Sequence, residues 1–351
     1  MAATAVENDV IGANQVSRTL RSTLFITVLI CGLVAYKGSA AIKSFRLAAT
    51  TGTIPASTRA SLVLPGQTSS MPDGVARTAA YLALIGPALV FGILIAGAVR
   101  ACASPSWIVE TLGRRPIRQQ LAAGAAGAPL MLCSCCVAPV FSAVYERSRR
   151  EGPSLAVALA APSLNPAALA LTFMMFRPQI AATRLALALI AVFVVAPAAA
   201  RLAGRARRAL SNAPPAHDDR HRCGPAGYVA SCAHVALRVV PLIFAGVAAS
   251  MWLVQRMPMD LMASGSGRIA AIALTSMIAV PLALPTFFEI PFALTLMSAG
   301  APAGIAAVVL FAGPAINLPS LLAIGRATSW RLAGLTALAI GLLAFMGGLI
   351  I

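Results

Sequence analysis

Charged residues are scarce in this sequence of 351 residues: they make up 11 % of the chain, against roughly 25 % in a typical soluble domain. A soluble protein of this length covers its surface with charge, whereas 59 % of this chain is hydrophobic. The same apolar composition excludes intrinsic disorder. The sequence therefore predicts an integral membrane protein with several spans.

Acidic residues and lysines are the rarest charges. The chain has 10 Asp+Glu against 27 Lys+Arg, a net charge of +17, and its only lysines are Lys37 and Lys43. Neither lysine completes a G-x-x-x-x-G-K-[ST] phosphate loop, so the chain carries no P-loop ATPase motif. The arginines lie in short clusters between apolar runs. This pattern is typical of the loops between membrane spans and not of a nucleic-acid-binding face. We expect a lipid bilayer, and no nucleic acid, as the partner of this surface.

Long apolar runs predict the membrane spans. Seven of them are about 20 residues long, enough to cross a bilayer; they lie at 22–42, 78–99, 153–175, 180–200, 229–254, 303–324 and 331–351. Two further runs, 119–145 and 269–298, are interrupted by Pro and Gly. The first run follows Arg18 and Arg21, as in a signal peptide, but it is followed by lysines and not by a clean cleavage site. An uncleaved signal anchor is therefore favoured over a signal peptide.

The sequence also contains an internal repeat. An offset of 152 residues, without a gap, aligns Pro129 with Pro281, Pro139 with Pro291, Gly152 with Gly304, Pro162 with Pro314, and Asn165 with Asn317. An offset of 154 aligns Pro87 with Pro241 and Gly92 with Gly246. Because these matches fall on Pro, Gly and Asn, and not on the abundant Ala and Leu, a true repeat explains them better than chance.

The charge distribution bears on how the repeats are oriented. If the two interrupted runs are re-entrant hairpins, each repeat has about three spans and the second is inverted. With a cytoplasmic linker, the inside segments then hold 17 basic residues and the outside segments nine. If both runs cross fully, the bias weakens. We expect an all-α polytopic protein of the cell (inner) membrane, divided into a tail and anchor helix (1–45), a loop (46–77), repeat 1 (78–200), a basic cytoplasmic linker (201–227) and repeat 2 (228–351).

The first interrupted run carries three cysteines, Cys133, Cys135 and Cys136, before Pro139. Proline lacks an N–H and frees a helical carbonyl, and unpaired backbone in a bilayer is tolerated only beside protein or a water-filled cavity. We therefore expect a helix break at Pro139 and three substrate-binding thiols suited to soft ions. The alternative is that these cysteines are small apolar fillers. Zinc-binding histidines are missing, and we expect neither a resident metal nor a cofactor.

The second interrupted run has no cysteine but carries Glu289. The other nine acidic residues map to loops or span ends, so Glu289 is the only acid inside an apolar run. A buried carboxyl is costly unless it is paired, solvated or protonated. This predicts a coupling role, with a helix cap or a partner for Arg238 as the alternatives. Thr286 is a candidate substrate contact, and Pro291 a candidate helix break.

Two more helix breaks are predicted inside long spans. Their residues are Pro162, Ser163, Asn165 and Pro166 in repeat 1, and Pro314, Asn317 and Pro319 in repeat 2. Pro166 and Pro319 cannot donate to the carbonyl four residues earlier, so each break leaves a free carbonyl beside an asparagine. The asparagines either cap the break or contact the solute, and the two roles can coexist. Ser163 is a further candidate for solute contact.

At these segments the chain resembles the predicted-permease superfamily that includes the ArsP-type organoarsenical efflux permeases. The resemblance covers residues 80–351 and rests on LCSCCVAPV with APSLNPAALALTF, and on LPTFFEIPFALTLMSAGAP with AGPAINLPSLLAI. It implies that Cys133 and Cys135 match the family's cysteine pair, Pro139 the proline after it, and Asn165 and Asn317 its paired asparagines. Cys136 stands where many members have glycine. The resemblance implies a polytopic permease, with trivalent methylated arsenicals as one substrate.

Four functions remain open at this point, one of which, a non-transporting assembly factor, would be indicated by a stable co-purifying partner. The first is a secondary permease that exports a small thiophilic or metalloid solute, with Glu289 coupling transport to protons. The second is a permease of another substrate class whose cysteines are structural. The third is a membrane thiol or redox protein, which needs a low-pKa thiol with an exposed partner. We expect a transporter and not an enzyme.

Overall fold

The protein is helical throughout the part that can be described. The computed structural model describes residues 23–39, 41–43, 45–46, 49–50, 71–102, 115–208, 224–254, 267–284, 287–298 and 300–351, and these contain no β-strand. Seven helical segments in these ranges are long and apolar enough to span a membrane: Thr23–Lys43, Thr78–Cys102, Glu151–Met175, Pro178–Gly204, Pro225–Ser250, Ala303–Ala327 and Trp330–Ile350. Each coincides with one of the seven predicted spans. The predicted all-α polytopic membrane fold is confirmed.

The elements that follow the N-terminal helix are α3 (Met71–Cys102), α5 (Pro116–Gly127), the short helix η1 (Ala128–Leu130), α6 (Ser134–Ser148), α7 (Glu151–Ser163), α8 (Pro166–Met175), α9 (Pro178–Ile190), the π-helical turn η2 (Ala191–Val195), α10 (Ala196–Arg208), α11 (Pro225–Val254), α13 (Arg268–Ala279), α14 (Glu289–Ser298), α15 (Ala303–Ala315), α16 (Leu318–Ala327) and α17 (Trp330–Ile350). α9, η2 and α10 are continuous and form one span.

The helix boundaries repeat as the sequence does. α5, α7, α8 and α9 begin 152 residues before α13, α15, α16 and α17, and the first three pairs also end 152 residues apart. α3 and α11 correspond as two long helices, each with an internal proline, Pro87 and Pro241. Each repeat is therefore a long helix, a hairpin, a broken span and a final span.

Both broken spans are interrupted at an asparagine. α7 gives way to α8 at Leu164 and Asn165, and α15 gives way to α16 at Ile316 and Asn317. A proline follows at the start of each second helix, where its missing N–H costs no hydrogen bond. In each of these two spans 78 % of the most apolar stretch is buried inside the protein, against at most 50 % in the other spans. The broken spans are thus the centre of the bundle.

Small residues allow the central helices to approach closely. α15 packs against α17, and a Cβ added to Gly304 of α15 would lie 2.2 Å from the carbonyl oxygen of Gly348. Close packing at small residues is a main source of helix association in lipid, where burial of apolar surface from water contributes little. The glycine at 304 therefore fixes the distance between these two helices.

The two hairpins differ in where the chain breaks. In the first, the helix is interrupted at 131–133, with Met131 in the left-handed region (φ 49°), and Pro139 lies inside α6. The break therefore comes before Pro139 and not at it, because α6 continues through the proline. In the second, α13 ends at Ala279 and α14 begins at Glu289, with Pro291 in its first turn. Pro162 and Pro314 likewise lie in the last turns of α7 and α15.

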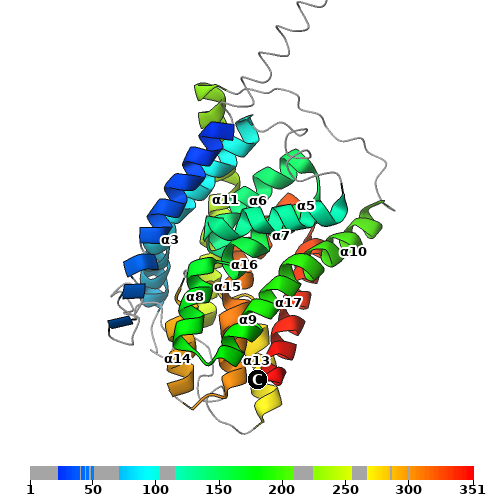
Figure 1. Cartoon of the computed structure of the whole chain (residues 1–351). Helices are drawn as coiled ribbons and strands as arrows, with labels where there is room; N and C mark the ends of the chain where they lie inside the picture. Colours follow the sequence, from blue (N-terminus) through cyan, green and yellow to red (C-terminus); the bar gives the residue numbers. More distant parts are fainter. Residues whose placement is uncertain are drawn as a thin grey trace, which may run out of the picture.

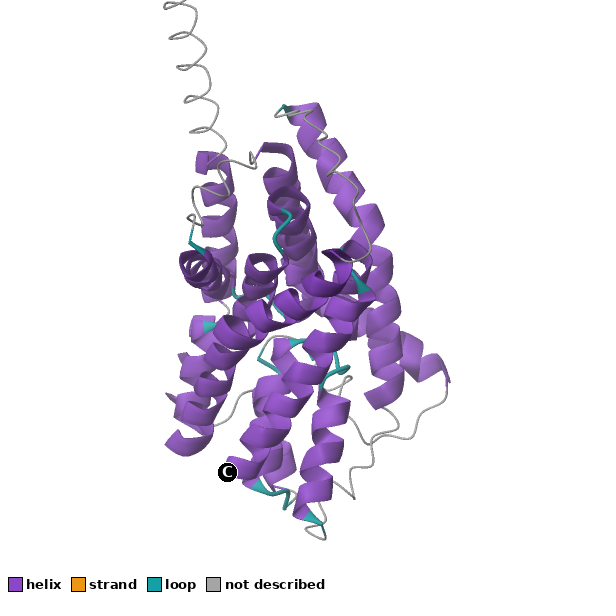
Figure 2. Ribbon diagram, turned by 90° about the vertical axis from the view of Figure 1, so that its right-hand side faces the viewer, coloured by secondary structure: helices purple, strands orange, loops and turns teal. Residues whose placement is uncertain are grey.

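The hairpins lie at opposite ends of the molecule, as an inverted repeat requires. Figure 1 places α5 and α6 in its upper part, near the ends of α10 and α11 that face the linker, and α13 and α14 at the lower end beside the C-terminus. Figure 2 shows short loop segments in the middle of the helix bundle as well as at its ends. The interruptions of the central spans thus bring non-helical backbone into the interior of the bundle.

The expected segment boundaries shift where helices extend into predicted loops. α3 begins at Met71 inside the predicted loop 46–77, with Pro72 and Asp73 in its first turn, where both residue types are favourable. α10 runs to Arg208, into the predicted linker. Most of the loop (51–70) and of the linker (209–223) lies outside the described residues, so the domain limits stay predictions.

Candidate functional site

The first hairpin places its cysteines at the start of α6. Cys133 is the N-cap residue, and Cys135 and Cys136 lie in the first turn, with side chains 5 %, 0 % and 0 % exposed. The Sγ atoms of Cys133 and Cys136 are 2.9 Å apart. Cys133 and Cys136 have the spacing C-x-x-C, which is typical of redox-active cysteines. This spacing supports the redox alternative, although no histidine lies nearby in the sequence. All three cysteines are free thiols.

The thiol of Cys135 lies next to that of Cys133 and also contacts the other repeat. The side-chain amide of Asn317 donates to Cys135 Sγ at 2.9 Å, and the hydroxyl of Tyr81 lies 3.4 Å from the same sulfur. Asn317 belongs to repeat 2, whereas Tyr81 is on α3. The sulfur cluster, which we define as Tyr81, Cys133, Cys135, Cys136 and Asn317, therefore joins the two repeats in the interior.

The close approach of α3 to α6 depends on a glycine. A Cβ at Gly92 would lie 2.4 Å from the carbonyl oxygen of Cys136, far inside van der Waals contact. Pro139 cannot donate to the carbonyl of Cys135, so the first turn of α6 has fewer internal hydrogen bonds than an ordinary helix. Gly92 thus lets α3 cover this turn and bury the thiols.

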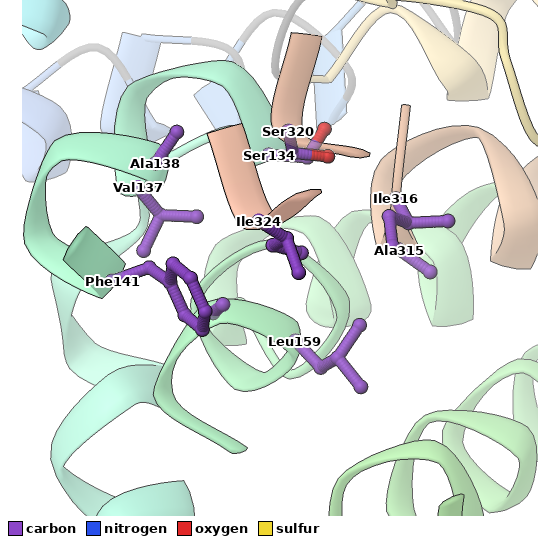
Figure 3. Close-up of a pocket in the computed structure, with 10 residues that line it drawn as sticks. Ser134, Val137, Ala138, Phe141, Leu159, Ala315, Ile316, Ser320 and Ile324 are labelled. Atoms are coloured by element: carbon purple, nitrogen blue, oxygen red, sulfur yellow. The ribbon is translucent and has the colours of Figure 1, made fainter. Parts of the chain in front are cut away.

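A small cavity lies between the repeats next to Ser134, and none of the three cysteines is among the residues that line it. Val137, Ala138 and Phe141 of α6 line one side, Ala315 and Ile316 the other, with Ile324 between them and Leu159 below (Figure 3). The cavity has room for about one water molecule. Its polar lining comes from Ser134 and Ser320, and the hydroxyl of Ser134 is buried without a hydrogen-bond partner. Ser134 is a candidate that the sequence analysis missed, although it lies between two of the cysteines.

In the described part of the chain, no three His, Cys, Asp or Glu side chains converge as a metal site. Cys133 and Cys136 hold their sulfur atoms 2.9 Å apart, while the thiol of Cys135 also contacts Asn317 and Tyr81. Two sulfurs suit a ligand with two exchangeable positions better than a tightly held metal ion.

The second hairpin carries a buried ion pair. Glu289 begins α14 and its Oε1 accepts a hydrogen bond from Arg184 Nη2 of α9 at 2.8 Å; the side chains are 2 % and 1 % exposed. Arg184 Nη1 also donates to Thr172 Oγ1 of α8 at 2.5 Å. Glu289 and Arg184 are the only charged residues that are buried among those described. We name Thr172, Arg184 and Glu289 the charge cluster.

Arg184 is the functional residue that the sequence analysis placed differently. The charge distribution in the sequence analysis treats Arg184 as one of the nine outside basic residues. The structure instead buries Arg184 inside a span. An arginine within an apolar run, with a lone acid in another run, was the signal for such a pair. Arg238, considered as a partner for Glu289, instead lies 3.5 Å from Glu146 and is largely exposed.

The two asparagines are helix caps. Asn165 Oδ1 accepts from the backbone N–H groups of Ala167 and Ala168, and Asn317 forms a capping box with Ser320. The amide nitrogen of Asn317 reaches Cys135, whereas that of Asn165 is buried without a partner. The repeat explains the difference. The residue that corresponds to Cys135 is Phe287, whose side chain has no polar atom to accept a hydrogen bond from the amide of Asn165.

The remaining predicted contacts are placed as follows. The hydroxyl of Ser163 donates to the carbonyl of Leu159 within α7. Thr286 lies outside the described residues. Among the described residues no hydrogen bond joins the sulfur cluster to the charge cluster, so the thiols and the carboxyl form two polar groups and not a single one. Their roles in substrate binding and coupling stay predictions.

Comparison with known proteins adds the family. A family model described as "Predicted permease" (ArsP_1) matches residues 74–351, which include both repeats. The chain belongs to this predicted-permease family. Among curated proteins, the permease is 26 % identical over 255 residues to the UPF0718 protein YraQ of Escherichia coli (strain K12), covering 70 % of this chain and 71 % of that one.

A second relative matches a shorter part of the permease. The UPF0718 protein MJ0584 of Methanocaldococcus jannaschii is 33 % identical over 84 residues, which is 24 % of this chain and 23 % of that protein. No solved structure matches. Family membership and seven apolar helices make the permease a multi-pass membrane transport protein, and they point to a transporter and not to an enzyme.

Proposed function

We propose that this permease is a secondary exporter of small thiophilic solutes across the cell (inner) membrane, with trivalent methylated arsenicals as the substrate class. The observation that carries the proposal is the pair of Cys133 and Cys136, whose sulfur atoms are 2.9 Å apart and buried in the sulfur cluster that joins the two repeats through Cys135 and Asn317. Substrate sites of inverted-repeat transporters lie at such interfaces, next to broken helices.

The chemistry of the solute fits two adjacent thiols. A trivalent methylarsenical carries one methyl group and two exchangeable hydroxyls. At each sulfur an As–S bond forms and an As–O bond breaks, and the thiol proton leaves with the hydroxyl as water, so no atom changes its oxidation state. Water reverses both steps on release. The solute has two exchangeable positions, so two As–S bonds leave none for a third sulfur, and Cys135 is already engaged by Asn317 and Tyr81.

Glu289 is proposed to couple export to protons. Its support is burial: among the described residues it is the one acid in the interior, and an ionisable residue at membrane depth marks a proton or ion path by default. The sequence lacks a P-loop, which favours a secondary mechanism over ATP hydrolysis.

The test is export from an efflux-deficient cell that expresses the full chain. We expect the wild-type protein to lower the accumulation of methylarsenite more than that of arsenite or soft metal ions. Cys133→Ser and Cys136→Ser should each abolish most of this export, because one As–S bond is lost. Cys31→Ser is the matched control, since Cys31 is exposed on the N-terminal helix, and it should export like the wild type.

Two results would count against the proposal. Unchanged accumulation of every solute in cells with wild-type protein would remove the thiophilic substrate class. Normal export by Cys133→Ser and Cys136→Ser would leave the cysteines a structural role and favour a permease of another class.

A membrane thiol–disulfide protein is the second candidate, favoured by the C-x-x-C spacing of Cys133 and Cys136 at the start of a helix. Their burial opposes it, because exchange requires access to a partner disulfide. A thiol–disulfide exchange assay on the purified protein separates the two: the exporter predicts no turnover of a disulfide substrate.

A further inference from the structure

The charge cluster stands where the other repeat has an apolar contact. The 152-residue offset pairs Glu289 with Val137, Thr172 with Ile324, and Arg184 with Thr336. Val137 and Ile324 line the same cavity, with α6 packed directly against α16. On the side of Glu289 and Thr172, an arginine from α9 bonds to both residues. A guanidinium therefore lies between α14 and α8, where an inverted repeat leads one to expect direct helix packing.

The packing of the helices shows the same asymmetry. α6 packs against α3, α7, α11 and α16, whereas α14, within the described residues, packs extensively only against α15. α8 and α14 make no contact comparable to that of α16 and α6. The ion pair with Arg184 is thus the polar link that ties α14 to repeat 1.

The charge balance at this link is simple. Apart from Glu289, neither α14 nor the adjacent helices α8 and α15 contain a titratable side chain, and Arg184 is the charged group that faces the carboxyl. If Glu289 becomes neutral, Arg184 is left buried with no opposite charge, which is strongly unfavourable. The conformation described here is therefore the one that a deprotonated Glu289 stabilises.

We propose that the charge cluster is the coupling switch of the transport cycle: a proton taken up by Glu289 breaks its pair with Arg184 and releases α14 to pack against α8, while α6 separates from α16. The two repeats thereby exchange conformations. The carboxylate gains one proton from the solution on one side and returns it on the other, and Arg184 keeps its charge throughout. The proposal rests on the proposed coupling role of Glu289 and adds Arg184 and Thr172 as the residues that position it.

Hydrogen–deuterium exchange of the substrate-free full chain in lipid nanodiscs tests the switch directly. Glu289→Gln should slow exchange several-fold in α8 and α14 and accelerate it in α6 and α16. The double variant Arg184→Thr with Glu289→Val copies the residues of the other repeat, keeps no buried charge, and should shift in the same direction. Glu151→Gln is the matched control, because Glu151 is partly exposed at the start of α7; it should match the wild type.

Transport by the same variants in liposomes supplies the second readout, with methylarsenite as the probe. Glu289→Gln should lose accumulation driven by a pH gradient, at least tenfold, and keep exchange of labelled for unlabelled solute. Arg184→Gln should change the pH profile of transport, since it removes the charged group that faces the carboxyl of Glu289. A purely structural role for the pair would change the amount of folded protein without moving the pH profile.

The outcomes separate the two proposals. If exchange in α6, α8, α14 and α16 stays as in the wild type in both the single and the double variant, the switch is overturned, whatever the substrate. If the exchange pattern shifts but the wild type carries no methylarsenite, the substrate class fails and the switch stands. If gradient-driven transport by Glu289→Gln equals that of the wild type, proton coupling through this residue is excluded.

Discussion

Asn165 and Asn317 occupy the same position in the two repeats, yet their side chains make different hydrogen bonds. Both accept backbone hydrogen bonds at the start of a helix, which a broken span requires because its first N–H groups have no partner in lipid. The second function of an asparagine, its amide donor, is used only at Asn317, which reaches Cys135. The cap is thus shared by both repeats, and the contact across the repeats belongs to one of them.

Replacing each asparagine by serine separates these two roles. Serine still caps a helix but is too short to reach Cys135. We expect Asn317→Ser to lower the stability of the purified protein by about 1 kcal/mol, the net contribution of a typical hydrogen bond. Asn165→Ser should be close to neutral, because the amide of Asn165 has no partner to lose. Thermal unfolding in detergent measures both, and equal losses in the two variants would contradict a role for the contact with Cys135.

Helix packing stabilises the first hairpin as much as hydrogen bonds do. α6 begins after a left-handed residue, contains a proline in its second turn, and is covered by α3 at a glycine. The break at the left-handed residue and the proline leave backbone carbonyls without helical partners, which lipid does not tolerate. The hairpin is therefore stable only inside the bundle, with α3, α7, α11 and α16 around it.

Gly92→Ala tests the approach of α3 to α6. The added Cβ would lie 2.4 Å from a backbone oxygen, so the helices must separate, and overpacking of this kind costs about 1–3 kcal/mol. Gly86→Ala is the matched control on the same helix, where a Cβ meets nothing within 4 Å. It should be neutral or stabilising, since alanine favours helices over glycine by about 1 kcal/mol. A thermal shift assay distinguishes them, and Gly92→Ala with wild-type stability would mean that α3 does not determine the burial of the thiols.

At the scale of the whole molecule, the two ends of the bundle are closed differently. At the end near the linker, Glu146 of α6 pairs with Arg100 of α3 and lies 3.5 Å from Arg238 of α11. Such partly exposed pairs each contribute about 0–1 kcal/mol, so they orient this end more than they stabilise it. At the opposite end, α14 is held by α15 and by the buried ion pair. One end thus depends on helix packing and the other on a titratable carboxyl.

Topology is the second property of the whole molecule that can be tested. The arginine clusters predict that the linker 201–227 is cytoplasmic and that the end of α17 lies outside. A reporter that is active only in the cytoplasm should be active when inserted at residue 214 and inactive after Ile351, and a reporter active only outside should give the reverse pattern. Activity of the same reporter at both sites would contradict an odd number of spans between them.

Much of this architecture follows from local properties of the sequence. Span length reflects the thickness of the bilayer, and a proline or a capping asparagine acts on its own turn of helix. For this reason the seven spans, the 152-residue repeat and the interruptions at Asn165 and Asn317 could be predicted without coordinates. The break in the first hairpin was placed at Pro139, but the structure has it at 131–133, because packing by α3 lets α6 accommodate a proline in its interior.

Contacts between distant segments required the tertiary structure. Arg184 and Glu289 are 105 residues apart, and Cys135 and Asn317 are 182 apart. The sequence determined that Glu289 needs a partner or a proton, since a charge in lipid is costly. Only the fold decided that the partner is Arg184 and not Arg238, and that Cys135 bonds to Asn317 of the other repeat. Local chemistry specifies which groups must be satisfied, and the packing of helices from both repeats selects the partners that satisfy them.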